Sequence, residues 1–266
     1  AEMGLQMMLD NLREAERRNL DELSKKLAEM QQQIANLVRR QAGHNLDNLA
    51  LQGKPADKLD AKLADALLAM AERDKAHLPA RTPLPLLSSG QELTERNTRD
   101  IAQTIEKLPS GSEPAENLTR AASKMERAIV ALRAKDLPGA YEPPQIDALA
   151  SLLDAKKIID KQKSDVDQKK DEQQKEAVRQ AYMKIRADQQ KLNAETVRID
   201  KTPRAADGSL PRPDAIRLGQ LPGEEAKLGD RTHDLEEALA AVNSVVYIWA
   251  NKDIVNSMNE VKDDLA

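Results

Sequence analysis

The chain has 266 residues, of which 40% are hydrophobic and 32% are charged, so it can bury a core and is too apolar to be disordered throughout. It contains no Cys, which excludes disulfides, thiolate metal sites and cysteine catalysis. The formal net charge is −4, acids and bases alternate along the chain, and one Trp, three Tyr and no Phe are present. Nucleic-acid binding needs a basic surface and stacking aromatics, so we do not expect it.

The composition also predicts a fold class. The chain is rich in Ala, Leu, Glu, Lys and Gln, which favour helix, and poor in the aromatic and β-branched residues that favour strands. We therefore predict an all-α fold, an elongated helical bundle with long coiled-coil-like helices. Aliphatic and Met side chains must fill its core.

A long helix is predicted at the start of the chain, over about 5–41, because no proline interrupts this segment and Gly43 follows as a stop signal. Its apolar residues are spaced alternately by three and four, which is a heptad pattern: Leu20, Leu23, Leu27, Met30, Ile34 and Leu37. Such a stripe either fills the chain's own core or binds a helix of a partner.

Further helices are predicted over about 55–77, 91–108 and 112–134. A proline-rich connection then follows, with Tyr141 as a plug between helix ends. This connection separates an N-terminal helical bundle, 1–140, from a C-terminal helical hairpin, 141–266. The two halves either form separate domains or pack together as one unit.

The charged stretch DKQKSDVDQKKDEQQKE, at 160–176, is either a disordered tether or a helix with little to bury. It contains no Gly or Pro and is rich in good helix formers, which favours an unbroken helix over about 145–200. A loop rich in Pro and Gly, about 201–223, joins it to a last helix over about 223–265. The most buried turn of that helix is predicted between Leu239 and Trp249.

One histidine is a candidate for phosphotransfer. The segment RTHDLEEAL resembles the phospho-accepting box of sensor histidine kinases, in which a helical His is followed by an acidic residue and Leu. His233, Asp234 and Leu235 match that pattern, whereas residues 236–238 depart from the basic residue, Thr and Pro that typically follow. The resemblance implies phosphotransfer at His233, and the alternative is an exposed His on a surface helix.

The residue pattern gives little support for a metal, nucleotide or cofactor site. His44, His77 and His233 are far apart and none has a second His at helical spacing, so we predict no metal site. No glycine-rich phosphate loop is present, so we predict no nucleotide, no other cofactor and no enzymatic activity. The proline-rich loops at Pro79–Pro85 and Pro203–Pro222 leave one alternative, a ligand cleft between them.

The segment 121–162, AASKMERAIVALRAKDLPGAYEPPQIDALASLLDAKKIIDKQ, resembles helical repeats of large bacterial envelope proteins that are rich in Gln, Glu, Ala and Leu. The C-terminal segment MNEVKDDLA resembles the same repeats. The resemblance implies an extracytoplasmic, non-enzymatic region of a longer protein. Helical patterns that begin almost at residue 1 and continue almost to residue 266 agree with a piece of a longer chain. No apolar run approaches the roughly 20 residues that a membrane span requires.

We therefore predict a non-enzymatic structural or protein-interaction module, a segment of a larger protein or assembly, which binds a protein partner or itself through helix faces. The alternatives are a phosphotransfer or signalling domain that uses His233, and a helical ligand-binding protein. The candidate partner surface consists of apolar residues from both long stripes: Leu20, Leu23, Leu27, Met30, Ile34, Leu37, Ile254, Met258 and Val261.

Overall fold

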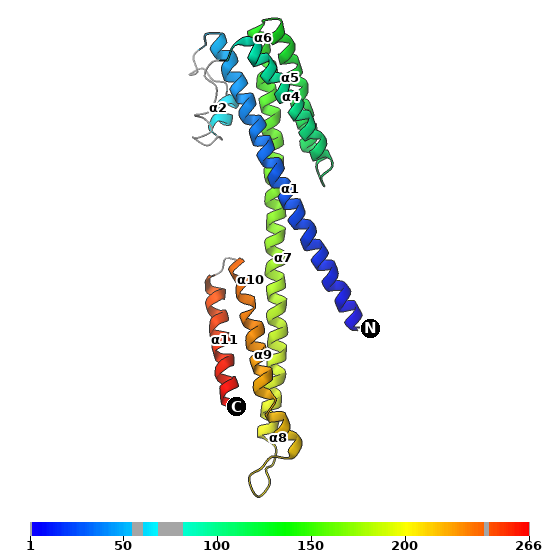
Figure 1. The fold of residues 1–266 in the computed structure, drawn as a ribbon, viewed down its shortest axis with the longest axis vertical. Helices are drawn as coiled ribbons and strands as arrows, with labels where there is room; N and C mark the ends of the chain where they lie inside the picture. Colours follow the sequence, from blue (N-terminus) through cyan, green and yellow to red (C-terminus); the bar gives the residue numbers. More distant parts are fainter. Residues whose placement is uncertain (1, 55–60, 69–81, 242–244, 266) are drawn as a thin grey trace. The chain divides into compact units, whose positions relative to one another are not determined.

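The computed structural model of the chain describes residues 2–54, 61–68, 82–241 and 245–265 (Figure 1). These ranges are helical with short connections and contain no strand, which confirms the predicted all-α fold. The chain divides into two compact units, Ala1–Asp167 and Gln168–Ala266. This division lies 27 residues beyond the predicted one at 140/141, inside helix α7 (Ile146–Asp200).

Hydrogen bonds from α1 (Glu2–Leu51) hold the first part of α7 in the first unit. The Ser24 hydroxyl donates to Asp167 at 2.8 Å, and the Gln31 amide donates to Asp160 at 2.7 Å. Val166, the one apolar residue of the charged stretch, is buried in the core of this unit. These contacts explain why the first unit extends past the predicted boundary.

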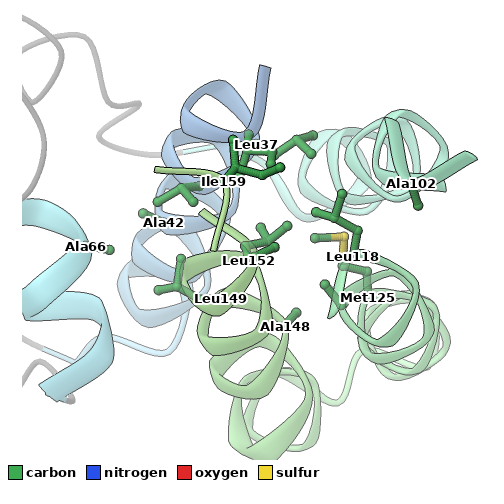
Figure 2. Close-up of a cluster of buried hydrophobic side chains, with 14 of the residues drawn as sticks. Leu37, Ala42, Ala66, Ala102, Leu118, Met125, Ala148, Leu149, Leu152 and Ile159 are labelled. Atoms are coloured by element: carbon green, nitrogen blue, oxygen red, sulfur yellow. The ribbon is translucent and has the colours of Figure 1, made fainter. Parts of the chain in front are cut away.

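The described residues of the first unit form six helical elements besides the beginning of α7. They are α1, α2 (Ala61–Leu68), α4 (Leu84–Glu106), α5 (Ser112–Arg133), α6 (Leu137–Ala140) and the π-helical turn η1 (Tyr141–Gln145). Figure 2 shows how α1, α5 and α7 contribute Leu37, Leu118, Met125, Leu149 and Leu152 to a shared core.

Alanines let the helices of this unit approach one another closely. Ala42, Ala121 and Ala148 are fully buried, and Ala102 is almost so. In a chain without Phe, leucines from one helix fill the space beside alanines of the next, which gives a dense core with few aromatic rings. Tyr141 is the one aromatic residue in this cluster, and its role as a plug between helix ends stays a prediction.

In the second unit, the described residues form the rest of α7 and four more helices. These are α8 (Arg212–Leu218), α9 (Leu221–His233), α10 (Leu235–Ala241) and α11 (Val245–Leu265). Its core is small and contains Ile185, Leu192 and Ile199 of α7, Leu221 and Leu228 of α9, and Met258 of α11.

Several predicted boundaries in the N-terminal half were wrong. Helix α1 continues through the buried Gly43 to Leu51, because tertiary contacts on both sides of that glycine outweigh its weak helix propensity. Gly53 follows the end of the helix; its positive φ of 70° turns the chain and lets the Lys54 N–H donate to the Leu49 carbonyl at 3.0 Å. Helix α4 begins at Leu84 instead of residue 91, with a proline in its first turn.

Other predictions in this half agree with the structure or concern residues outside the described ranges. Helix α5 agrees with the prediction over 112–134, and the continuous α7 confirms that residues 160–176 are helical. The predicted helix 55–77 is described only over Ala61–Leu68. His77 and Pro79 lie outside the described residues.

The prediction of one continuous helix over 223–265 was also wrong. Helix α11 returns along α9, and the Asn251 side-chain amide donates to the Thr232 carbonyl at 3.0 Å, across 19 residues of chain. The Tyr182 hydroxyl of α7 donates to the Asn251 side-chain oxygen. Asn251 therefore joins three helices, while Trp249, predicted at the most buried turn, is 72% exposed.

The loop predicted over 201–223 is shorter than expected. Its second part forms α8 and the start of α9, and each of these helices carries a proline in its first turn. The prolines therefore begin helices instead of preventing them.

We expect Asn251→Ala to destabilise the second unit by about 2 kcal/mol, because the substitution leaves the buried Thr232 carbonyl and the Tyr182 hydroxyl without their partner. Urea unfolding followed by circular dichroism measures this change. The matched control is Asn256→Ala on the exposed side of the same helix, which should change stability by less than about 0.5 kcal/mol. Equal effects of the two substitutions would contradict the role given to Asn251.

Candidate functional site

Two features stand out as candidate sites, a layer of buried amides in the first unit and an exposed apolar face in the second. The amide layer consists of Gln41, Asn45, Asn48, Gln91 and Gln145, all of which are fully buried. Residue patterns had not singled it out, since Gln and Asn are ordinary residues of exposed helix faces.

The amides of this layer satisfy one another. Gln91 donates to Gln41 at 2.6 Å, Gln145 donates to Gln91 at 3.0 Å, and Asn48 donates to the Gln145 side chain at 2.8 Å. Asn45 accepts from Gln41 at 2.8 Å and donates to the Gln145 carbonyl at 3.3 Å. Because each amide already has partners on α1, α4 or η1, the layer holds these helices together and leaves no open group for a ligand.

His44 lies at the edge of the amide layer, half-buried between α1 and α4. Its Nε2 is 3.0 Å from the Thr94 hydroxyl. Burial lowers the pKa of His44 to about 4, although a hydrogen bond with the Gly90 backbone acts in the opposite direction, and nearby Arg40 lowers it further. A methyl group on Gly90 would lie 2.8 Å from His44 Cε1, so the absence of a side chain at position 90 makes room for the ring.

Asp47 is a second titratable group on the same helix. It is buried, and its Oδ1 has no hydrogen-bond partner among the described residues. Burial raises the pKa of Asp47, while a hydrogen bond with Thr82 lowers it. His44 and Asp47 are therefore both held toward their neutral forms, as expected of groups packed in a helical core.

The exposed face lies on α11. We call Val246, Tyr247, Trp249, Ile254 and Val261 the α11 face; their exposed fractions are 75%, 60%, 72%, 39% and 41%. At 100° per residue, Val246, Ile254 and Val261 line one side of the helix together with the exposed Ala250. Tyr247 and Trp249 flank this line on its two sides.

The predicted partner-surface residues of α11 are thus divided. Ile254 and Val261 belong to the α11 face, whereas Met258 is buried in the core of the second unit, where the Thr232 hydroxyl contacts its sulfur at 3.5 Å. Met258 is therefore a core residue, and its prediction as part of the partner surface was wrong. Val246, Tyr247 and Trp249 lie in the segment predicted to be most buried, and this prediction was wrong, because a helix that folds back cannot be recognised from its apolar period alone.

The predicted stripe on α1 is mostly core. Leu27, Met30, Ile34 and Leu37 are buried in the first unit, so for these four residues the partner-surface prediction is corrected. Leu20 and Leu23 are half-buried against the same core. Farther toward the N-terminus, Met8 and Leu12 are 63% and 65% exposed, so α1 also carries apolar side chains that its own unit leaves uncovered.

His233 is the last residue of α9, and its side chain is 66% exposed. Its Nδ1 lies 3.4 Å from a Glu236 carboxylate oxygen. The ring is accessible, and phosphotransfer at this position stays a prediction.

Two grooves are lined mainly by polar and charged side chains. One of about 640 Å³ lies between α4 and α5, and its lining includes Ala102, Ala115, Arg99, Arg120 and Glu116. The other, of about 520 Å³, lies between α7 and α9. Ligand pockets are usually lined by apolar and aromatic groups, so neither groove resembles one.

The described residues show no arrangement that supports a metal site, a membrane span or the predicted ligand cleft. No group of three or more metal-ligating side chains converges among the described residues. Within the same residues, no helix combines the length and apolarity that crossing a membrane requires. The predicted ligand cleft included Pro79, which lies outside the described residues, while Pro83 and Pro85 belong to the start of α4.

We expect His44 to lower the stability of the first unit as the pH falls from about 6.5 to about 4. Over this range the unfolded chain binds a proton at His44 that the folded chain excludes, and protonation therefore favours unfolding. Each full pH unit between the two pKa values corresponds to about 1.4 kcal/mol, and because His44 is only half titrated in one of the two states at each end of the range, its total contribution is on the order of 2–3 kcal/mol.

The variant His44→Gln isolates this effect, because Gln can still bond with Thr94 but does not titrate. Urea unfolding of both proteins at several pH values should show a shallower pH dependence for the variant. Identical pH profiles would show that His44 does not titrate differently on folding. The raised pKa of Asp47 makes its deprotonation above about pH 3.8 unfavourable to the folded state. This contribution to stability is present in both proteins, so it does not enter the difference between them.

Comparisons with known proteins do not assign the chain to a family. The chain matches no family model, and searches of the curated proteins and of the solved structures returned no match. The resemblance of residues 121–162 to envelope-protein repeats therefore stays a prediction.

Proposed function

We propose that the chain is a non-enzymatic helical module that binds another protein through the α11 face. The observation that carries the proposal is the exposure of Trp249 and Tyr247, two of the four aromatic residues in the chain. In a protein without Phe, a Trp could contribute the largest buried area of any side chain. Its position outside the core favours a role in binding.

Aromatic side chains supply much of the binding energy in protein interfaces, and Trp and Tyr are enriched among their most important residues. Covering the two rings would remove on the order of 300 Å² from water, which corresponds to about 7 kcal/mol of transfer free energy before association is taken into account. The aliphatic residues Val246, Ile254 and Val261 extend this surface along α11.

The polar character of the grooves also supports a module that acts through its helix faces. Charged side chains that line the two grooves form ion pairs. Arg99 of the groove between α4 and α5 pairs with the neighbouring Glu95, and Arg231 pairs with Asp188 inside the groove between α7 and α9. Such pairs are typical of solvated helix surfaces and suggest no substrate.

The experiment compares three forms of the full chain in a pull-down from its native extract, washed at high and low salt. Alongside the unmodified chain, a variant carries Val246→Ser, Trp249→Ser and Ile254→Ser, and a matched control carries Leu93→Ser, Val130→Ser and Met183→Ser. The control positions are 55%, 64% and 58% exposed, so they lose similar apolar surface on other helices.

We expect a stoichiometric protein to survive the high-salt wash with the unmodified chain and the control, and to be reduced at least tenfold with the α11 variant, because losing central apolar contacts costs about 2 kcal/mol or more. Unfolding by urea should be unchanged in all three within about 1 kcal/mol, since the replaced side chains are exposed. Equal retention by the two variants would refute the proposed role of the α11 face.

A further inference from the structure

The charged residues beside the α11 face form a row of one sign. Trp249 is followed on the same side of the helix by Asp253, Glu260 and Asp264, at spacings of four, seven and four residues. All three acids are exposed, and none has an ion pair with a described residue. The row therefore lies directly alongside Val246, Ile254 and Val261.

From this arrangement we propose that the occupant of the α11 face is a basic amphipathic helix of a partner protein. Its apolar stripe would cover Val246, Ile254 and Val261, and its Lys or Arg side chains would lie beside the acidic row. The proposal rests on the proposed function and adds the chemistry of the partner to it.

Charge complementarity is what selects this partner. Three like charges next to an apolar strip repel a partner of the same sign and attract one of opposite sign, and opposite charges beside an apolar seam determine which helices pair. Trp249 stands at the beginning of the row, where its ring can also receive a cation from the partner, an interaction for which Trp is the best aromatic acceptor.

A second copy of the chain fits this face less well. In a two-fold antiparallel pairing of α11 with α11, each flank of one helix meets the same flank of the other. Asp253, Glu260 and Asp264 of one copy would then face the acidic row of the other copy. An anionic membrane surface is disfavoured for the same electrostatic reason, since it attracts basic residues.

The test uses the full chain and the fluorescence of Trp249, which is the single Trp in the sequence and is 72% exposed. The probes are two synthetic amphipathic helical peptides without Trp that share one leucine stripe. One carries Lys at every flanking position and the other carries Glu. Binding of a helix over the α11 face transfers Trp249 out of water and shifts its emission to shorter wavelength.

We expect the Lys peptide to shift the emission and to bind at least tenfold more tightly than the Glu peptide, with an affinity that falls as salt is added. The charge-reversed variant Asp253→Lys, Glu260→Lys and Asp264→Lys should invert this preference. A matched control, Asp154→Lys, Asp165→Lys and Asp171→Lys, makes the same change in net charge at exposed positions of α7 and should keep the preference of the unmodified chain.

Several outcomes would overturn the proposal. They are equal binding of the two peptides, no emission shift with the Lys peptide, and an inverted preference in the α7 control. Neutral lipid vesicles that shift the emission when the Lys peptide does not would point to a membrane surface instead. A dimer in sedimentation that the α11 serine variant abolishes would identify a second copy as the occupant.

Failure of this proposal is distinguishable from failure of the proposed function. If the pull-down partner depends on the α11 face but the peptide preference is absent, protein binding stands and the basic helix is wrong. If the pull-down shows no dependence on the α11 face, the proposed function itself is wrong.

Discussion

The buried amides of the first unit are the constraint on which its helix arrangement depends. Its apolar core is made mostly of Leu, Ala, Ile and Met, and such a surface allows one helix to slide along another with little change in contact area. Hydrogen bonds among Gln41, Gln91 and Gln145 allow one register only, because a shift along α1 or α4 would leave several buried amides unsatisfied. The apolar side chains supply stability, and the amide layer supplies specificity.

In the second unit, a single buried side chain fixes the positions of the helices. Asn251 is fully buried and bonds with both Thr232 and Tyr182, so it sets the position of α11 against α9 and α7. Around it the core contains few apolar residues. Ion pairs such as Arg217 with Glu224 add little stability at the surface, so the position of α11 depends mainly on this asparagine and on the packing of Met258.

The exposed aromatic residues follow from this placement. Once Asn251 and Met258 point into the unit, the helical period turns Val246, Trp249 and Ile254 toward solvent. Helix α11 therefore has more apolar surface than its own unit covers. The acidic row beside this surface keeps it from being uniformly hydrophobic, and it is also the feature that would discriminate between partners.

The sequence by itself determined the fold class and the longest helices. Propensity and the absence of Gly and Pro were sufficient for the continuous helix over 160–176, because these effects are local. Only the tertiary structure decided what each apolar stripe contacts. Leu27 and Ile34 are core while Trp249 is exposed, and Gly43 continues a helix, because these outcomes depend on residues far away in the chain, such as Gln91 beside Gln41 and Thr232 beside Asn251. A hydrophobic period reports that a face will be covered, but it does not identify the helix that covers it.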